Sequence, residues 1–272
     1  MRGRRYPPIV AVRLTVVALL VAAAAAAPAL TSTTRFHRVL RTAGSTRAEA
    51  VYADGGVGHA RQPHVRISRR GRLLLAERVP GPGRHGTAFR IGPVWGDWFV
   101  VRDLDGDGEP EVSVDVWWYG MDCCVWSRVY RFDGRRYAAT MHWWGVLDAK
   151  PRMRDLDRDG RPELLSVDDR FGALGPHVLV FYPVQIWAYD RGTFRDVTRR
   201  FPEMIARHAA RLWHDHIRYR GTRVDPYVLA AWAADESMLG RGHAGDRELA
   251  RAVRSPTYLA SLRAFLQRNG YR

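Results

Sequence analysis

The chain has 272 residues, of which 46% are hydrophobic and 26% charged, a balance that is typical of a folded globular protein and excludes a disordered one. Its formal net charge is +15, and because Lys150 is the only lysine, arginine supplies nearly all of the basicity. No nucleic-acid-binding module accompanies this charge, so we expect a solvated basic surface and no nucleic-acid partner.

Residues 1–29 predict a secretion signal. Arginines precede an apolar run over residues 14–27, which has the length of a signal's apolar region and is shorter than the ~20 residues that span a membrane. Ala27 and Ala29 are small, as cleavage after Ala29 requires; the alternative is an uncleaved anchor. We therefore expect a secreted chain, or one associated with the cell surface or cell wall, with no membrane span after signal removal.

Residues 30–48 are expected to form a leader, as a loop or short helix, and residues 49–200 a β-rich region. Turn residues between β-prone runs indicate three hairpins, at Arg70-Gly71, Asp133-Gly134 and Asp190-Arg191-Gly192. An acidic loop and a strand precede the last two hairpins. The region thus contains two full repeats and one degenerate repeat, and units of roughly 50 residues with about four strands have the size of a β-propeller blade.

After residue 200 the pattern changes to helices, so that the predicted fold class is mainly β with a small all-α unit over residues 201–272. Apolar spacing and capping residues predict helices over residues 201–217, 225–239, 245–253 and 255–270. Their apolar stripes are too large to face water. We expect them to cap the β units and to bury Trp213 and Trp232 at least partly.

Two acidic loops carry the most specific signal, and we name them the first loop, "DLDGDGEPE", and the second loop, "DLDRDGRPE". In both, positions 1, 3 and 5 are Asp, position 6 is Gly and position 9 is Glu. At positions 1, 3, 5, 7 and 9 the first loop has Asp103, Asp105, Asp107, Glu109 and Glu111, and the second has Asp155, Asp157, Asp159, Arg161 and Glu163.

This spacing predicts two Ca²⁺ sites. Calcium takes about six to eight oxygen ligands in a flexible cage. Side chains 1, 3, 5 and 9 supply carboxylates, and the glycine permits a turn that brings the backbone carbonyl of position 7, from Glu109 or Arg161, to the ion. An EF-hand needs a Glu at position 12, where this chain has Val114 and Ser166. Magnesium and a merely acidic turn are the alternatives.

The loops resemble the FG-GAP / VCBS-type repeat, the calcium-loop blade of integrin-α-like β-propellers, and the region 49–200 looks like repeat-containing secreted proteins of actinobacteria. The segment "FGALGP" (171–176) faintly echoes the family signature, whereas position 9 is Glu where the family usually has Asp. The resemblance implies calcium binding and an extracellular role in recognition or adhesion. The expected partner is an extracellular ligand, a polysaccharide or a protein.

Two further features leave alternatives open. Cys123 and Cys124 are adjacent, so they form either a vicinal disulfide or two free thiols. Trp117-Trp118 and Trp143-Trp144 are pairs on strands, where alternation turns one member of each pair away from the other.

We expect a non-catalytic binding or structural module, since no H-E-x-x-H, G-x-S-x-G or phosphate loop is present. The alternative is an extracellular hydrolase of the glycosidase type, which would use Asp115, Asp168 or Asp169 in a Trp-lined cleft. Two carboxylates about 5–10 Å apart in a deep cleft would favour this alternative. The histidines of residues 201–217 do not share the spacing of a zinc pair.

Overall fold

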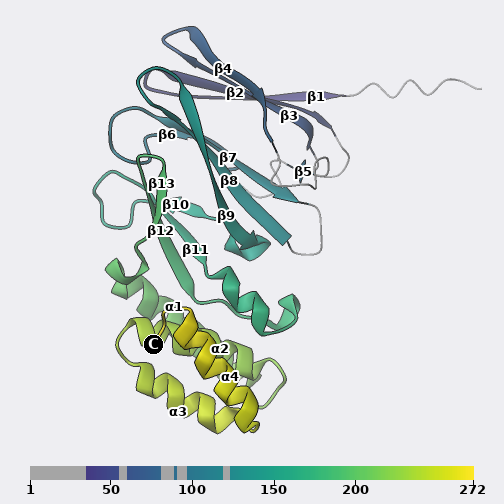
Figure 1. Ribbon diagram of the computed structural model, residues 1–272, viewed down its shortest axis with the longest axis vertical. Helices are drawn as coiled ribbons and strands as arrows, with labels where there is room; N and C mark the ends of the chain where they lie inside the picture. The colour runs from purple at the N-terminus through teal and green to yellow at the C-terminus, as the bar shows by residue number, and fades with distance from the viewer. Residues whose placement is uncertain (1–34, 55–59, 81–88, 91–96, 119–122) are drawn as a thin grey trace, which may run out of the picture. The chain divides into compact units, whose positions relative to one another are not determined.

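The computed structural model describes residues 35–54, 60–80, 89–90, 97–118 and 123–272. All of them belong to one compact unit, and the predicted signal at residues 1–29 lies outside them. Within this unit three antiparallel sheets follow one another along the chain, and four helices come after the last sheet (Figure 1). The prediction of a mainly β fold with a helical C-terminal part is therefore confirmed.

All three sheets are antiparallel, and we name them A, B and C. Sheet A contains β1 (Phe36–Ala43), β2 (Thr46–Asp54), β3 (Ala60–Arg69) and β4 (Arg72–Arg78). Sheet B contains β5 (Phe89–Arg90), β6 (Phe99–Arg102), β7 (Glu111–Trp118), β8 (Cys123–Phe132) and β9 (Tyr137–Val146). Sheet C contains β10 (Arg152–Arg154), β11 (Glu163–Val167), β12 (Val184–Asp190) and β13 (Thr193–Asp196).

The expected leader at residues 30–48 is wrong, because β1 and the start of β2 lie within it. These strands pair through a tight turn at Gly44, whose φ of +50° favours glycine. Sheet A is consequently a complete four-stranded unit that has this turn where sheets B and C have an acidic loop. No residue of β1 is fully buried, so it lacks the apolar alternation that reveals a half-buried strand.

The described strands form three separate sheets and do not close into a ring. Sheets A and B share one core, in which Val65 and Ile67 of β3 meet Val112 and Val114 of β7. A second core joins sheets B and C to the helices. Three units of four or five strands are present, as the repeats predicted, but a propeller ring is not seen among the described residues.

The helices begin and end near the predicted residues. They are α1 (Pro202–Tyr219), α2 (Asp225–Met238), α3 (Gly242–Ala252) and α4 (Pro256–Arg268). Proline occupies the first turn of α1, α2 and α4, where its missing N–H is no loss. Ser255 caps α4 by accepting a hydrogen bond from the Tyr258 amide.

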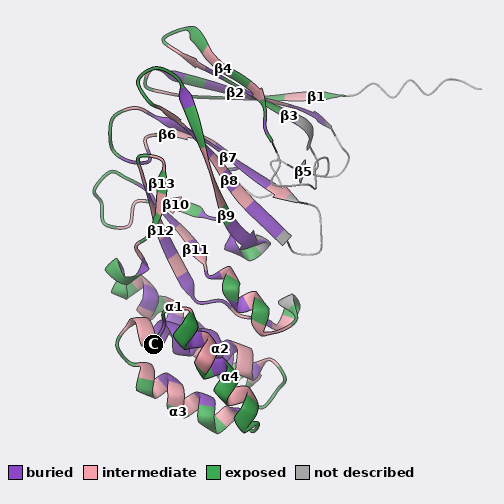
Figure 2. Ribbon diagram, viewed as in Figure 1, coloured by how far each residue is buried: buried purple, intermediate pink, exposed green. Residues whose placement is uncertain are grey.

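The helices share a core with sheets B and C and are not an independent domain, as predicted. Leu212 of α1 and Trp232 of α2 are buried in the same cluster as Val129 and Leu164 of the sheets, and Trp213 packs against it. Figure 2 shows buried segments along α2 and along strands of sheets B and C. Ile217 of α1 is exposed, and its neighbour His216 is buried instead, bonded through Nδ1 to Asp225 Oδ1 at 2.6 Å.

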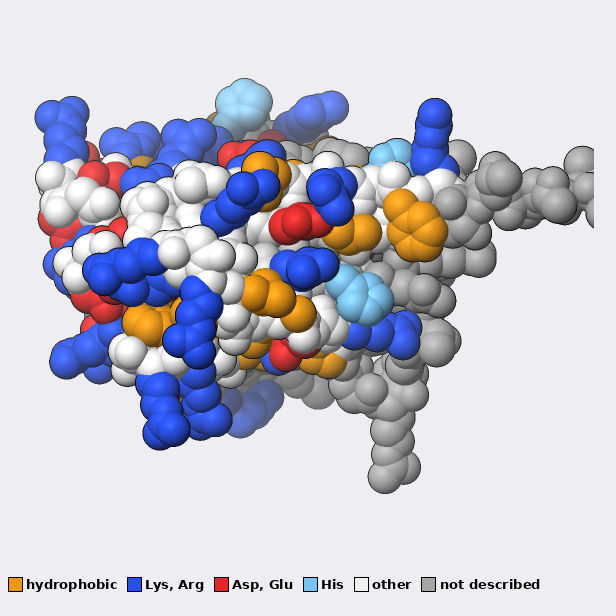
Figure 3. Space-filling view, turned by 90° about the horizontal axis from the view of Figure 1, so that it is seen from above, with side chains coloured by type: hydrophobic (Ala, Val, Ile, Leu, Met, Phe, Trp, Pro, Cys, Tyr) orange, Lys and Arg blue, Asp and Glu red, His pale blue; other side chains and the backbone are white. Residues whose placement is uncertain are grey.

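The basic charge is spread over the surface that sheet A presents. Figure 3 shows arginine side chains scattered across this face, with isolated hydrophobic side chains between them. Phe36, Leu40 and Leu73 are the large exposed apolar residues of this sheet. In the part of the chain that is described, no helix is both long and apolar enough to cross a membrane.

Candidate metal centre

Each acidic loop connects two antiparallel strands at one end of a sheet. The first loop joins β6 to β7, and the second joins β10 to β11, as the β-prone flanks predicted. Positions 4 and 6 have positive φ in both loops: Gly106 (+77°) and Gly108 (+86°) in the first, Arg158 (+65°) and Gly160 (+90°) in the second. Glycine adopts this conformation without strain, and the second loop tolerates an arginine in it at position 4.

The same four side-chain-to-backbone hydrogen bonds brace both loops. The carboxylate at position 1 accepts a hydrogen bond from the backbone amide of position 6, and the carboxylate at position 3 accepts one from the amide of position 5. The carboxylate at position 5 accepts one from the amide of position 7, and the glutamate at position 9 accepts one from the amide of position 2. Their donor–acceptor distances range from 2.8 to 3.4 Å. The repeated sequence therefore produces a repeated loop conformation.

The loops bring three of the predicted carboxylates together. In each loop one oxygen from each of positions 1, 3 and 9 lies within 4.8 Å of the others. These triads are Asp103, Asp105 and Glu111 in the first loop, and Asp155, Asp157 and Glu163 in the second. Position 5 belongs to neither triad. Asp107 accepts a hydrogen bond from Arg131, and Asp159 accepts one from Arg161.

Each triad contains a buried oxygen that accepts no hydrogen bond from any described residue. In the first loop this is Oε1 of Glu111, whose side chain is fully buried, and in the second it is Oδ1 of Asp155. Arg131 Nε lies 3.9 Å from Glu111 Oε1, which is beyond hydrogen-bond distance. A buried carboxylate oxygen without a hydrogen bond is unfavourable, so such an atom indicates room for a further positive partner. A hard cation with oxygen ligands fits this donor set.

The buried glutamate of the first loop has a strongly perturbed acidity. Burial raises the pKa of Glu111 to about 8, against the hydrogen bond from the Leu104 amide, and the negative charge of Asp105 raises it further. The pKa of Glu163 is raised for the same main reason, burial, as its position in the second loop is equivalent. Both pKa values are raised because several negative charges lie close together where solvent cannot screen them.

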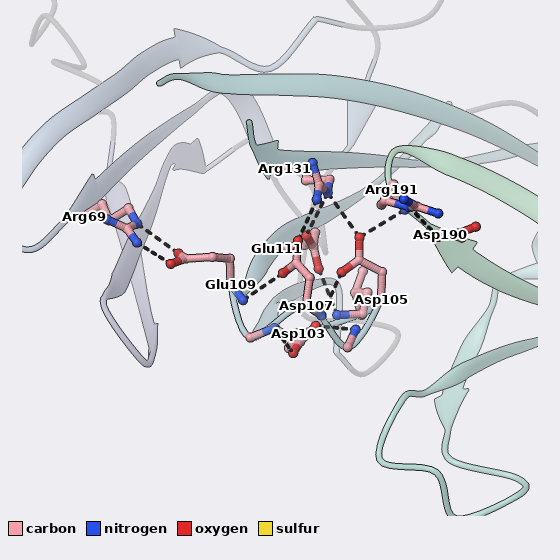
Figure 4. A network of polar contacts seen from close by, with 12 residues as sticks. Arg69, Asp103, Asp105, Asp107, Glu109, Glu111, Arg131, Asp190 and Arg191 are labelled. Atoms are coloured by element: carbon pink, nitrogen blue, oxygen red, sulfur yellow. Dashed lines mark hydrogen bonds and ion pairs between the residues drawn. The ribbon is translucent and has the colours of Figure 1, made fainter. Parts of the chain in front are cut away.

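Arginines that the loop motif did not reveal surround the first loop (Figure 4). Arg131 of β8 donates from Nε to Asp105 Oδ2 (3.1 Å) and from a terminal nitrogen to Asp107 Oδ2 (2.5 Å). The Arg191 amide, in the β12–β13 turn, donates to the same Asp105 oxygen at 3.0 Å. Arg69 of β3 forms a two-pronged ion pair with Glu109. The first loop is thereby linked to all three sheets.

Tyr189 of β12 adds a polar group beside the first loop. Its hydroxyl is buried and has no hydrogen-bond partner among the described residues. Burial raises the pKa of Tyr189, and the negative charges of Glu111 and Asp105 raise it further.

The second loop is more open to solvent. Asp157 has one arginine nearby, Arg200, whose terminal nitrogen lies 3.4 Å from Oδ2, and the side chains of these residues are 33% and 58% exposed, respectively. Arg161 at position 7 pairs with Asp159 within the loop. Its stem also lies against Gly106 of the first loop, where a Cβ would be 2.6 Å from the arginine's Cδ. The two loops are therefore neighbours in space.

The aspartates proposed for a hydrolase have separate environments. Asp168 accepts hydrogen bonds from Arg170 and from the Tyr271 hydroxyl (2.7 Å), and Asp169 accepts from the Val146 amide (2.9 Å). Asp169 also accepts a hydrogen bond from the indole nitrogen of Trp143 at 3.4 Å.

Asp115 has a different setting, because it lines a cavity of about 620 Å³. Burial raises its pKa to about 6, although Lys150, 3.8 Å away, and a 2.5 Å hydrogen bond from Ser127 oppose the shift. Asp97 and Asp148 line the same cavity, but no tryptophan is among the described residues that do so.

The remaining predictions concern the cysteines and tryptophans. Cys124 is disulfide-bonded, whereas the side chain of Cys123 is outside the described residues, so the vicinal pairing stays a prediction. Trp144 is buried and Trp143 is 47% exposed, as alternation along a strand requires.

Comparison with known proteins gives one relative and no functional assignment. No family model and no solved structure matches the chain. The chain is 29% identical over 199 residues to the "Uncharacterized protein y4bJ" of Sinorhizobium fredii (strain NBRC 101917 / NGR234). This alignment covers 67% of the chain but only 29% of the relative. The resemblance to FG-GAP and VCBS repeats therefore rests on the loop residues themselves.

Proposed function

We propose that this protein is a secreted, calcium-binding β-repeat protein that acts as a non-catalytic binding or structural module outside the cell. The three sheets would be blade-like units of the FG-GAP / VCBS type, and the two loops would each hold one Ca²⁺. The ligand of such a module would be an extracellular polysaccharide or protein.

The observation that carries this proposal is the pair of unpartnered buried oxygens. Glu111 Oε1 and Asp155 Oδ1 are each part of a carboxylate triad, and neither accepts a hydrogen bond from a described residue. The arrangement favours calcium over magnesium. Calcium accepts irregular oxygen cages, whereas Mg²⁺ demands octahedral geometry and keeps its water. An acidic turn without metal would leave these oxygens unpaired in both loops.

Thermal unfolding tests the proposal. Calcium binds the folded loops and not the unfolded chain, so at a concentration 100 times the dissociation constant each site adds ~2.7 kcal/mol of stability. The melting temperature in millimolar calcium should exceed that in chelator by several degrees. Replacing both Asp105 and Asp157 with Asn should abolish this increase, and magnesium at the same concentration should produce less of it. A melting temperature that chelator and calcium leave equal would refute the proposal.

One observation keeps the hydrolase alternative in view. Asp115 combines a raised pKa with a position on a cavity that two other aspartates line. Hydrolysis of polysaccharide substrates that Asp115→Asn abolishes would favour an enzyme, whereas activity that persists in this variant would exclude Asp115 from catalysis.

A further inference from the structure

The first loop already contains a positive group, and the second loop does not contain its equivalent. The guanidinium of Arg131 bonds to Asp105 and Asp107, and its Nε lies 3.9 Å from the unpartnered Oε1 of Glu111. Figure 4 shows this side chain pointing into the group of carboxylates from the neighbouring strand. Arg131 is only 23% exposed, so its charge is held against the loop.

Strand register explains why the loops differ. In sheet B, Val112 pairs with Tyr130, and continuing the ladder by one residue sets Arg131 opposite Glu111. In sheet C, Leu164 pairs with Trp187, and the same step sets Ala188 opposite Glu163. Residues opposite each other on antiparallel strands project from the same face, so Arg131 and Ala188 occupy equivalent places.

Other arginines do not replace Arg131 in the second loop. Arg200 reaches Asp157 from the 3₁₀ helix Thr198–Arg200, beyond the end of sheet C, and is largely exposed. Arg161 engages Asp159, which lies outside the carboxylate triad. Among the described contacts, the triad residues Asp155 and Glu163 receive no arginine side chain.

We propose that Arg131 is an internal competitor of the divalent cation, so that the second loop binds Ca²⁺ first and the first loop binds it only when the guanidinium leaves. This inference rests on the proposed calcium function. Asp105 Oδ2 cannot accept two charge-assisted hydrogen bonds from Arg131 and Arg191 and also coordinate a cation at ~2.3–2.6 Å in the same geometry. The affinity of the first loop is lowered by the fraction of molecules in which Arg131 has left.

The asymmetry has a consequence for the folded protein without calcium. Arg131 neutralises part of the buried charge of the first loop, which lies among three sheets, so this junction is held together before any cation arrives. The second loop has only exposed arginines for this purpose and depends more on the ion. The two sites therefore differ in function. The second loop is the tighter calcium site, and the first loop is a junction between sheets that binds calcium only at a higher calcium concentration.

Calorimetric titration with calcium chloride measures the two loops separately. The Asp157→Asn variant reports the first loop and the Asp105→Asn variant the second. We expect the first loop to bind at least about tenfold more weakly. In the Asp157→Asn background, Arg131→Met retains the apolar stem, removes the guanidinium, and should tighten the first loop by about 10–100-fold.

Arg135→Met is the matched control. Arg135 is an exposed residue of the β8–β9 turn whose described contacts involve only its backbone amide, so this change removes the same charge without touching the loop. It should alter calcium affinity by less than about threefold, because solvent and salt screen exposed charges. Equal effects of Arg131→Met and Arg135→Met on calcium affinity would overturn the proposal. They would mean that Arg131 affects calcium binding only through the net charge of the protein.

A reverse substitution tests the same idea without disturbing Arg131. In the Asp105→Asn background, Ala188→Arg should weaken the second loop by about tenfold or more. This variant decides the question even if Arg131→Met does not fold. Equal affinities of the two loops in the parent variants would also contradict the competitor. If neither loop bound calcium, the proposed function itself would be refuted. This outcome differs from equal binding by the two loops, which would refute only the competitor.

Discussion

The two acidic loops have the same internal hydrogen bonds and different surroundings. In the first loop Asp105 and Glu111 are buried, and arginines from three sheets contact the carboxylates. In the second loop the Asp157 side chain is 33% exposed and forms an ion pair with the exposed Arg200. The comparison teaches that the Asp-x-Asp-x-Asp-Gly motif determines the conformation of the loop. The residues of the opposite strand and of the adjoining sheets determine how tightly the loop binds a cation.

The largest expected difference between the loops concerns position 3 in the absence of calcium. Asp105→Ala removes the acceptor of Arg131 Nε and of the Arg191 amide and should lower the free energy of unfolding by about 2–4 kcal/mol. Asp157→Ala breaks one exposed ion pair and should lower it by less than about 1 kcal/mol. Urea unfolding in the presence of chelator measures both.

Asp133→Ala provides a reference for removing a carboxylate from an exposed turn of sheet B. If Asp105→Ala and Asp157→Ala destabilised the protein equally, the buried arginine contacts of the first loop would contribute nothing beyond those of a surface pair.

A second difference lies at the fifth residue of the strand that follows each loop. Sheet B has Asp115, where sheet C has Val167 at the same position of the repeat. Because the folded pKa of Asp115 is raised from 3.8 to about 6, its stabilising contribution is complete below pH 3.8 and is lost as the pH rises through about 6. This change corresponds to about 2–3 kcal/mol. Relative to Asp115→Asn, the parent protein should therefore lose that much unfolding free energy between pH 4 and pH 7.

Taking the difference between two variants cancels the titration of all other groups. Val167→Asp should create a smaller loss at neutral pH in sheet C, since Val167 is only partly buried. A stability difference between the parent and Asp115→Asn that stays constant from pH 4 to pH 7 would disprove the raised pKa.

Features that depend on nearby residues were predictable from the sequence. The loop hydrogen bonds join residues two to seven positions apart, so the spacing of aspartate, glycine and glutamate specifies them. The helices were predictable for the same reason, because proline and Ser255 act within a single turn. Strand β1 was missed because both of its faces are at least partly exposed, which removes the alternation of apolar residues.

Features that depend on strand register were not predictable in the same way. Arg131 is 26 residues from Asp105, and Arg69 is 40 residues from Glu109, so only the arrangement of the sheets brings them together. One signal was available. The repeats align Arg131 with Ala188, and a charged residue facing an alanine at equivalent positions marks a site where the units differ.

The smallest expected difference concerns position 7, where the first loop has Glu109 and the second has Arg161. Glu109 forms its ion pair with Arg69 of sheet A, and this hydrogen-bonded partner lowers the pKa of Glu109. Arg161 pairs only within its own loop. Glu109→Gln should therefore lower the melting temperature by about 1–3 °C at pH 7, whereas Arg161→Gln should leave it nearly unchanged.

The pH dependence gives this small effect a distinctive sign. A carboxyl whose folded pKa is lowered stabilises the protein above its unfolded pKa, and the contribution is lost as the pH falls through the folded pKa. The difference in melting temperature between the parent and Glu109→Gln should hence be largest near neutral pH and vanish in acid. In a double-mutant cycle, Arg69→Gln should add almost nothing once Glu109 is replaced, because the two residues act as one pair. Additive effects of the two substitutions would mean that the Arg69–Glu109 pair does not couple sheets A and B, which Glu77 also links through Arg128 and Tyr130.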